Sequence, residues 1–120
     1  MRRRDQNLAA VAWVLVNGIP DGDRDQFRRR AMSLAPMLQG SGLAATAAFL
    51  RAKSVATLAT ELETHVLDTL GVSGDDRNNF IAWLGNLSAS EYRRAGAAAR
   101  EFATWVKRAA EALIPPTSAG

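Results

Sequence analysis

The sequence predicts an all-α fold, a compact single-domain bundle of five to six helices with a long C-terminal helix. The chain has 120 residues, which suffice for one domain with a buried core. Alanine, leucine and arginine dominate its composition, and the alternation of β-branched residues that is typical of strands is almost absent. Apolar residues instead recur at steps of three and four, which places side chains on one face of a helix. We expect a single helical domain over residues 1–116 and a flexible tail over residues 117–120.

The N-terminal part of the chain predicts two helices separated by a turn. The first covers Arg4–Val16, and turn-forming residues at 17–22 end it. The second begins at Asp23, whose carboxylate can cap it. Pro36 has no backbone N–H, so we expect a kink or a break around Ala35. The residues expected to face the core are Leu8, Val11, Ala12, Leu15 and Val16 of the first helix and Phe27, Ala31, Leu34 and Leu38 of the second.

Shorter helices are expected in the middle of the chain. After a stop at residues 40–42, Leu43–Lys53 forms an alanine-rich third helix. Ser54–Leu70 forms the fourth, with Gly71 as its C-cap. A fifth opens near residues 75–76, where two acidic residues suit the positive end of a helix dipole. The inward-facing residues are Leu43, Ala47 and Leu50, then Val55, Leu58, Leu62 and Val66, then Phe80, Trp83, Leu84 and Leu87.

The last predicted helix, Glu91–Leu113, carries an apolar stripe and a basic stripe on different faces. Ser88 and Glu91 have the spacing of a capping box, and Pro115 and Pro116 end the helix. At about 100° per residue, positions seven apart lie close together on the helix surface, away from the core. The apolar stripe consists of Tyr92, Ala95, Ala99, Phe102, Val106, Ala109 and Leu113, and the basic stripe of Arg93, Arg100 and Lys107.

Charge is distributed unevenly along the chain, although the formal net charge is only +3. Residues 26–60 contain no acidic residue, and their basic residues are Arg28, Arg29, Arg30, Arg51 and Lys53. Residues 54–76 contain acids but no lysine or arginine, and the last helix is again mainly basic. We expect a basic side and an acidic side. Each charge run could be a solvated helix face, but clustered guanidinium groups also favour an anion between them, and nucleic acid is an extended anion.

The sequence shows no motif for base-specific recognition of nucleic acid. A helix-turn-helix pattern is missing, and the aromatic residues fall at core spacing rather than among the basic residues. Any nucleic acid would therefore be held by its phosphates.

We expect no enzyme activity, metal or cofactor. His65 is the only histidine and there is no cysteine, so a partly exposed surface histidine is the favoured interpretation. Asp21, Asp23 and Asp25 alternate like the start of a calcium loop, but the glycine and glutamate that such a loop needs are missing. No apolar run approaches the roughly 20 residues of a membrane span. A basic start before the apolar run of the first helix resembles a secretory signal only superficially. We expect a cytoplasmic protein.

Two stretches resemble a known family. Ser33–Lys53 is similar to the leucine-proline helix, the GL turn and the "aFL..K" helix of the small α-helical subunit of the type III-B CRISPR effector, the Cmr complex. Tyr92–Leu113 is similar to the final helix of the same subunit, with a tyrosine-arginine start and a basic ending at residues 105–108. Their order and separation fit, so the resemblance covers most of the chain. Gly96 and Ala98 depart from it, since a threonine and a glutamate are expected there.

The resemblance implies a noncatalytic protein that stacks in a few copies beside the subunits holding the CRISPR RNA, in defence against foreign nucleic acid. It further implies contact with the guide–target RNA backbone, while base pairing selects the sequence. The matching basic residues are Lys53, which closes the first motif, and Lys107 and Arg108, which close the second. Arg93 and Arg100 join them by the stripe geometry, and Arg29 and Arg30 by charge clustering.

Several alternatives stay open. Arg108 could pair with Glu111 or Glu101, and Lys53 could stabilise a helix dipole. The whole chain could be a helical adaptor between proteins with no nucleic-acid role, or the type III-A small subunit. A small helical enzyme with a site shared with a partner is a further alternative.

Overall fold

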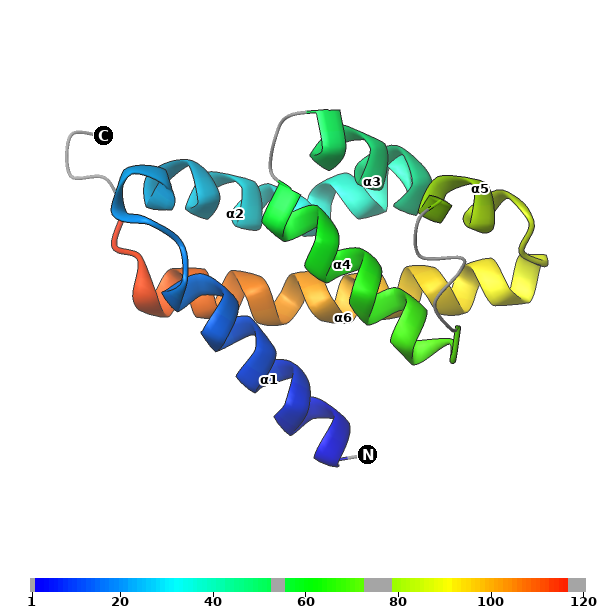
Figure 1. Ribbon diagram of the computed structural model, residues 1–120, viewed down its shortest axis with the longest axis horizontal. Helices are drawn as coiled ribbons and strands as arrows, with labels where there is room; N and C mark the ends of the chain where they lie inside the picture. Colours follow the sequence, from blue (N-terminus) through cyan, green and yellow to red (C-terminus); the bar gives the residue numbers. More distant parts are fainter. Residues whose placement is uncertain (1, 53–55, 73–78, 117–120) are drawn as a thin grey trace. The chain divides into compact units, whose positions relative to one another are not determined.

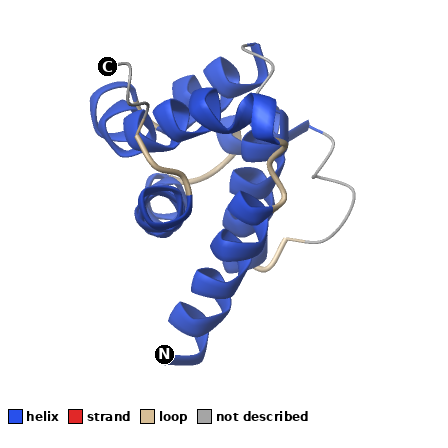
Figure 2. Cartoon of the chain, turned by 90° about the vertical axis from the view of Figure 1, so that its left-hand side faces the viewer, coloured by secondary structure: helices blue, strands red, loops and turns tan. Residues whose placement is uncertain are grey.

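The computed structural model describes residues 2–52, 56–72 and 79–116, and within these ranges every regular element is helical (Figures 1 and 2). The all-α prediction and the long C-terminal helix are confirmed. The predicted tail at 117–120 lies outside the described residues. Among the described residues, no helix is both long and apolar enough to cross a membrane. The elements are α1 (Arg2–Asn17), the 3-10 helix η1 (Asp21–Asp23), α2 (Arg24–Ser41), α3 (Leu43–Ala52), α4 (Ala56–Thr69), α5 (Phe80–Gly85) and α6 (Ala89–Leu113).

Contacts group the chain into two units, which are described separately. The first unit comprises residues 1–35 and 102–120, and the second comprises residues 36–101. Helices α2 and α6 therefore contribute residues to both units. The single domain over residues 1–116 stays a prediction.

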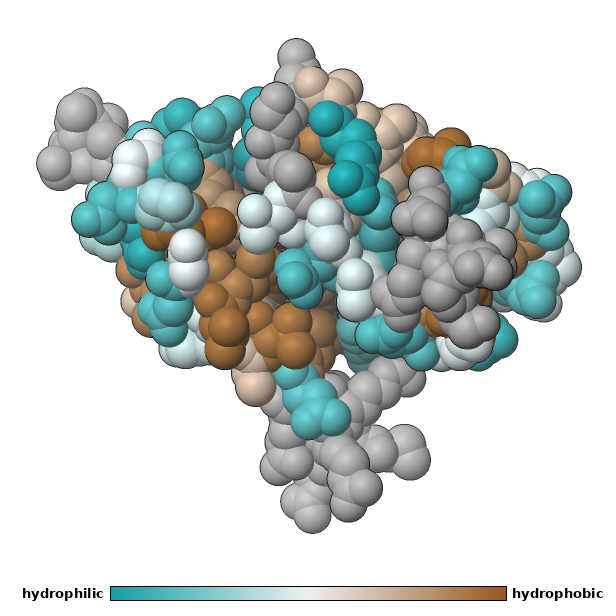
Figure 3. Space-filling view, in the orientation of Figure 1, coloured by the Kyte–Doolittle hydropathy of each residue, from teal (hydrophilic) through white to brown (hydrophobic). Residues whose placement is uncertain are grey.

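The first unit has an apolar core formed by α1, the start of α2 and the end of α6. Most of the predicted inward-facing residues are buried, but Val11 is 43% exposed and was wrongly assigned to the core. Val11 lies at the edge of the buried arc of α1. Hydrophobic residues gather on the surface over α1 in Figure 3, and the large exposed apolar side chains of this helix are Val11, Trp13 and Val14. The core consists of Leu8, Ala12, Leu15, Val16, Ile19, Phe27, Ala31, Leu34, Phe102, Ala103, Val106, Ala109, Ala110 and Ile114.

Helix α2 continues through Pro36, so of the kink or break expected around Ala35 the break is wrong. A proline removes one hydrogen bond from the helix, but the buried Leu34 and Leu38 on either side hold the chain by packing. The helix ends as predicted at Ser41. Gly42 follows with a φ of +87°, a left-handed conformation that favours glycine, and its N–H donates to the Leu38 carbonyl at 3.0 Å.

In the second unit, α3 contacts both α4 and α5. Leu43, Ala47 and Leu50 of α3 are buried as predicted, and Thr46 is buried beside them. Trp83 and Leu87, expected in the core, are only half-buried. The other core residues of this unit are Leu38, Leu58, Ala59, Leu62, Val66, Leu67, Phe80, Leu84, Ala95, Ala98 and Ala99.

Local signals set the ends of two helices in this unit. Gly71, with a φ of +74°, donates to the Asp68 carbonyl while Val72 donates to the Leu67 carbonyl, so a Schellman motif ends α4. At the start of α6, the Ser88 N–H donates to Glu91 Oε1 at 2.9 Å, and the Glu91 N–H donates to Ser88 Oγ at 3.2 Å. The predicted C-cap and capping box are both confirmed. The expected opening of the fifth helix at 75–76 lies outside the described residues.

Candidate nucleic-acid interface

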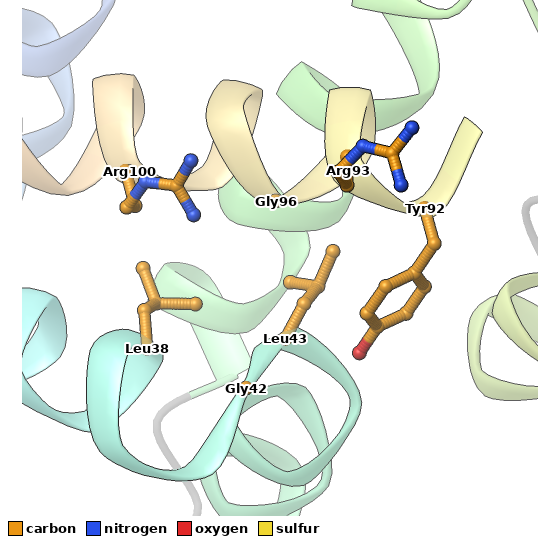
Figure 4. A pocket seen from close by; sticks show the side chains of 7 residues that line it. All are labelled: Leu38, Gly42, Leu43, Tyr92, Arg93, Gly96 and Arg100. Carbon is orange, nitrogen blue, oxygen red and sulfur yellow. The ribbon is translucent and has the colours of Figure 1, made fainter. Parts of the chain in front are cut away.

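A pocket of about 370 Å³ opens on the second unit where the end of α2, the start of α3 and the first turns of α6 meet. Its apolar walls come from two leucines and a tyrosine ring, two glycines leave backbone exposed, and two arginines supply positive charge (Figure 4). The lining residues are Leu38, Gly42, Leu43, Tyr92, Arg93, Gly96 and Arg100.

The tight turn at Gly42 places the α2 and α3 walls of the pocket next to each other. Thr46 N–H donates to the Gly42 carbonyl at 3.1 Å, so α3 starts directly after the turn. The Ala44 N–H at this helix start donates to the Tyr92 hydroxyl at 3.2 Å. This bond fixes the tyrosine ring of α6 against the start of α3. Because the Tyr92 oxygen is the acceptor, its own O–H can still donate to a ligand.

Gly96 creates the space that Arg100 occupies. A Cβ atom on Gly96 would lie 3.4 Å from Arg100 Nη1, so the guanidinium group lies over bare backbone. In Figure 4 the Arg100 side chain turns toward Gly96 above Leu38, and Arg93 lies on the other side of the glycine. Both arginines belong to exposed positions of α6, as their spacing predicted.

The pocket combines cationic donors with apolar walls. Guanidinium groups are planar, stay charged, and bind phosphate or carboxylate oxygens through paired N–H groups. None of the residues that line the pocket is acidic. The arrangement suits an anion that is joined to an apolar or planar group.

The remaining predicted site residues lie elsewhere. Lys107 is exposed in the first-unit part of α6, and the Arg108 guanidinium lies 4.9 Å from the centre of the Trp105 ring, a cation–π contact. Arg29 forms an exposed ion pair with Asp25 at 2.9 Å, and Arg30 is half-buried on the same helix. Lys53 lies outside the described residues. Of the seven predicted residues, the structure thus brings Arg93 and Arg100 together at one pocket.

The expected separation of a basic side from an acidic side does not hold for Arg51. Its guanidinium group donates from Nε to Glu63 Oε2 at 3.0 Å and from Nη2 to Glu63 Oε1 at 2.6 Å. The Glu63 side chain is only 8% exposed, and its hydrogen bonds raise the pKa of Arg51. The basic and acidic runs therefore neutralise each other here.

Two further arginines of the basic run bind backbone. Arg24 Nη2 donates to the Leu113 carbonyl at 3.0 Å, and Arg28 Nε donates to the Ile114 carbonyl at 3.0 Å. These carbonyls belong to the end of α6 and the residue after it, where a cation complements the helix dipole. Both arginines are part of the fold rather than of an open cationic surface.

His65 is a partly buried surface residue, as expected, with a side chain 16% exposed. Its Nε2 lies 3.3 Å from Glu101 Oε1, within hydrogen-bond distance, so the ring has a polar contact on α6. No group of three potential metal ligands is found in the described ranges 2–52, 56–72 and 79–116.

Sequence reasoning missed most of the pocket. Tyr92 was assigned to the core stripe, whereas it is half-buried and lines the opening. Leu38 and Leu43 were also assigned only to the core. The one available signal was Gly96, a glycine within a long helix at a position where the resembled family has a larger residue.

A family model described as CRISPR-associated protein (Cas_Cmr5) matches residues 4–113 of this chain. Comparisons with curated proteins and with solved structures give no match.

Proposed function

This chain belongs to the Cas_Cmr5 family of CRISPR-associated proteins, the small subunit of the type III-B complex, and we propose that it acts there as a noncatalytic RNA-backbone-binding scaffold. In this role it contacts the guide–target RNA through phosphates, while other subunits cleave. Copies of the chain stack along the complex, in the cytoplasm, in defence against foreign nucleic acid. The type III-B match favours this assignment over a type III-A subunit.

The observation that carries the proposal is the pair Arg93 and Arg100 at one pocket of the second unit. Two exposed guanidinium groups that lie about two helical turns apart can each hold a phosphate oxygen of one strand. Such contacts position RNA without reading its sequence, and base pairing to the guide supplies the specificity. Further contacts are proposed for Lys107 and Arg108, for Arg29 and Arg30, and for Lys53.

RNA titration at several salt concentrations tests the arginine pair. The wild-type chain should bind single-stranded and duplex RNA regardless of sequence, with an affinity that falls steeply with salt. Removing both guanidinium groups in the Arg93→Ala/Arg100→Ala variant should lower the affinity about tenfold or more. The salt slope should become shallower by about 0.7 for each lost contact with a single strand.

A matched control uses the adjacent arginine. Arg94 is exposed on the same helix but does not line the pocket. Arg94→Ala removes the same charge as Arg93→Ala, so it should have the smaller effect on RNA affinity. Equal effects of the two single substitutions would mean that general charge, not the pocket, binds RNA. An unchanged affinity in the double variant would remove these arginines from the proposal.

Copurification from the host tests the assembly. A tagged copy of the chain should bring RNA and the other effector subunits with it.

A helical adaptor without a nucleic-acid role is the second candidate. It is favoured by Val11 and Val14, which expose apolar surface on α1 at 43% and 73%. Exposed apolar side chains on one helix face are typical of protein contacts. The adaptor hypothesis predicts that the same partners copurify from the Arg93→Ala/Arg100→Ala variant with no RNA bound to the chain.

A further inference from the structure

The face of α1 that points away from the core carries an uncharged seam. Asn7, Val11, Val14 and Gly18 follow one another at steps of four, three and four residues, which places them along one side of the helix. All four are exposed, Val11 by 43% and Val14 by 73%. Gly18 continues the line beyond Asn17, because its N–H donates to the Val14 carbonyl at 3.1 Å. Residues 7–20 contain no charged side chain, so any partner of this seam is an uncharged surface.

The spacing of the seam is that of a two-stranded coiled coil, in which alternating steps of three and four residues keep one side of each helix against the other. When two copies of α1 run antiparallel, the seam is complementary to itself. Val11 of each copy then meets Val14 of the other copy. Asn7 meets Gly18, so the larger polar residue lies opposite the residue without a side chain.

The charges at the two ends of α1 favour the antiparallel direction. The helix begins with three arginines at residues 2–4 and one aspartate at residue 5, a basic start. It ends close to η1 in the sequence, where Asp21 and Asp23 are exposed. An antiparallel partner brings its basic start to this acidic end, and the same contact forms a second time at the other end of the pair. A parallel partner would instead bring two basic starts together, which repel each other.

We infer that α1 pairs with α1 of a second copy of this chain, antiparallel and about a two-fold axis that passes between Val11 and Val14. The occupant is a second copy because both the seam and the charges at its ends match themselves. A two-fold contact closes on itself, so it joins two copies and is separate from the stacking of several copies in the proposed function. The seam spans about three helical turns, so the interface is small and the pair is weak and reversible.

Sedimentation equilibrium of the full-length chain at several concentrations tests the pairing. The average mass should rise toward twice the monomer mass between about 10 µM and 1 mM, the range of affinity expected of a small interface. Val14→Lys places a charge in the seam twice per pair and should raise the dissociation constant about tenfold or more. Ile81→Lys on α5, which replaces an apolar side chain that is 43% exposed, is the matched control and should leave the constant unchanged.

Cysteine crosslinking tests the direction of the pair, since the chain has no cysteine of its own. The variants Asn7→Cys and Gly18→Cys are oxidised separately and as a mixture. Antiparallel pairing should give a disulfide between the two variants and none within either variant alone. In a parallel pair, each variant would form a disulfide with itself.

Each other outcome overturns a defined part. A monomeric mass at every concentration overturns the pairing. A dimer that persists in Val14→Lys overturns the seam as its interface, and disulfides of one variant with itself overturn the antiparallel direction. If the wild-type chain stays monomeric while Val14→Lys loses an effector subunit in copurification, the seam binds another protein instead. The Arg93→Ala/Arg100→Ala variant should dimerise like the wild-type chain, so a failure of RNA binding is distinguishable from a failure of the pair.

Discussion

Arginines have opposite roles in the two units of this protein. At the start of α2, in the first unit, Arg24 and Arg28 donate to the backbone carbonyls of Leu113 and Ile114. Near the start of α6, in the second unit, Arg93 and Arg100 line a pocket without an acidic residue. The first pair donates to backbone carbonyls of the fold, and the second pair lines an opening on the surface.

The difference shows that local acceptors, not the density of positive charge, decide what an arginine does. The α2 segment has the denser cluster of arginines in the sequence. Arg24 and Arg28 donate to carbonyls that are left without helical partners at the end of α6, and Arg29 forms an ion pair with Asp25. The α6 pair lies beside Gly96, which contributes no side chain to the lining. Substitutions of either pair test this comparison.

The largest loss of stability is expected from removing the two engaged arginines of the first unit. Arg24→Ala/Arg28→Ala leaves two carbonyls at the end of α6 without their charged donors, which should lower the free energy of unfolding by about 2 to 3 kcal/mol. Urea unfolding measures this loss. Arg29→Ala, which breaks only an exposed pair on the same helix, is the control and should change stability by less than about 0.5 kcal/mol. Equal losses in the two variants would contradict a role specific to the carbonyl contacts.

Arg51→Ala should have the next largest effect, because it leaves the nearly buried Glu63 carboxylate without its partner. Breaking a fully buried pair costs about 3 to 5 kcal/mol, but Arg51 is 50% exposed and water can replace part of the contact. We expect a loss of about 1 to 2 kcal/mol in urea unfolding, with little change in RNA affinity.

A double-mutant cycle isolates the Arg51 contact. In a Glu63→Gln background, Arg51→Ala should cost less than half as much, since the buried charge is gone. The same cost in both backgrounds would assign the loss to packing of the arginine stem instead.

The sequence sufficed for the helices and their ends because those depend on local interactions. The Ser88 and Glu91 capping box and the Gly71 C-cap involve residues within a few positions of each other, and apolar spacing identified most of the core. A break around Ala35, predicted as the alternative to a kink, does not occur, because packing on both sides outweighs one missing hydrogen bond.

The site could be predicted only in part, because partners across the chain are not visible in local spacing. The stripe geometry identified Arg93 and Arg100, but not the Tyr92 contact with Ala44, 48 residues away. Charge clustering gave no sign that Arg51 would meet Glu63. Which arginine faces a pocket depends on how α2, α3 and α6 pack, and that arrangement is set by the core rather than by the charges.

Gly96→Ala should separate the stability of α6 from the use of the pocket. Alanine in a helix interior is more favourable than glycine by about 0.5 to 1 kcal/mol, and the new methyl group meets only the flexible end of Arg100. Thermal unfolding should therefore show a higher midpoint. RNA affinity should fall slightly, because the methyl group narrows the space between the arginines. A gain in both quantities would show that the glycine does not serve binding.

The smallest effect is expected from the ionisation of Glu91 at the start of α6, in the second unit. Hydrogen bonds from the Ser88 backbone N–H and then from its side chain, with the charge of Arg94, lower the pKa of Glu91. A lowered pKa stabilises the folded state fully above the ordinary glutamate pKa of about 4.3, and this contribution is lost as the pH falls through the folded-state value.

Glu91→Gln keeps a side chain that can cap the helix but removes the charge. Its thermal midpoint should lie below that of the wild-type chain at pH 6, and the difference should vanish toward pH 3. A difference that stays constant over this range would mean that the cap depends on the shape of the side chain and not on its charge.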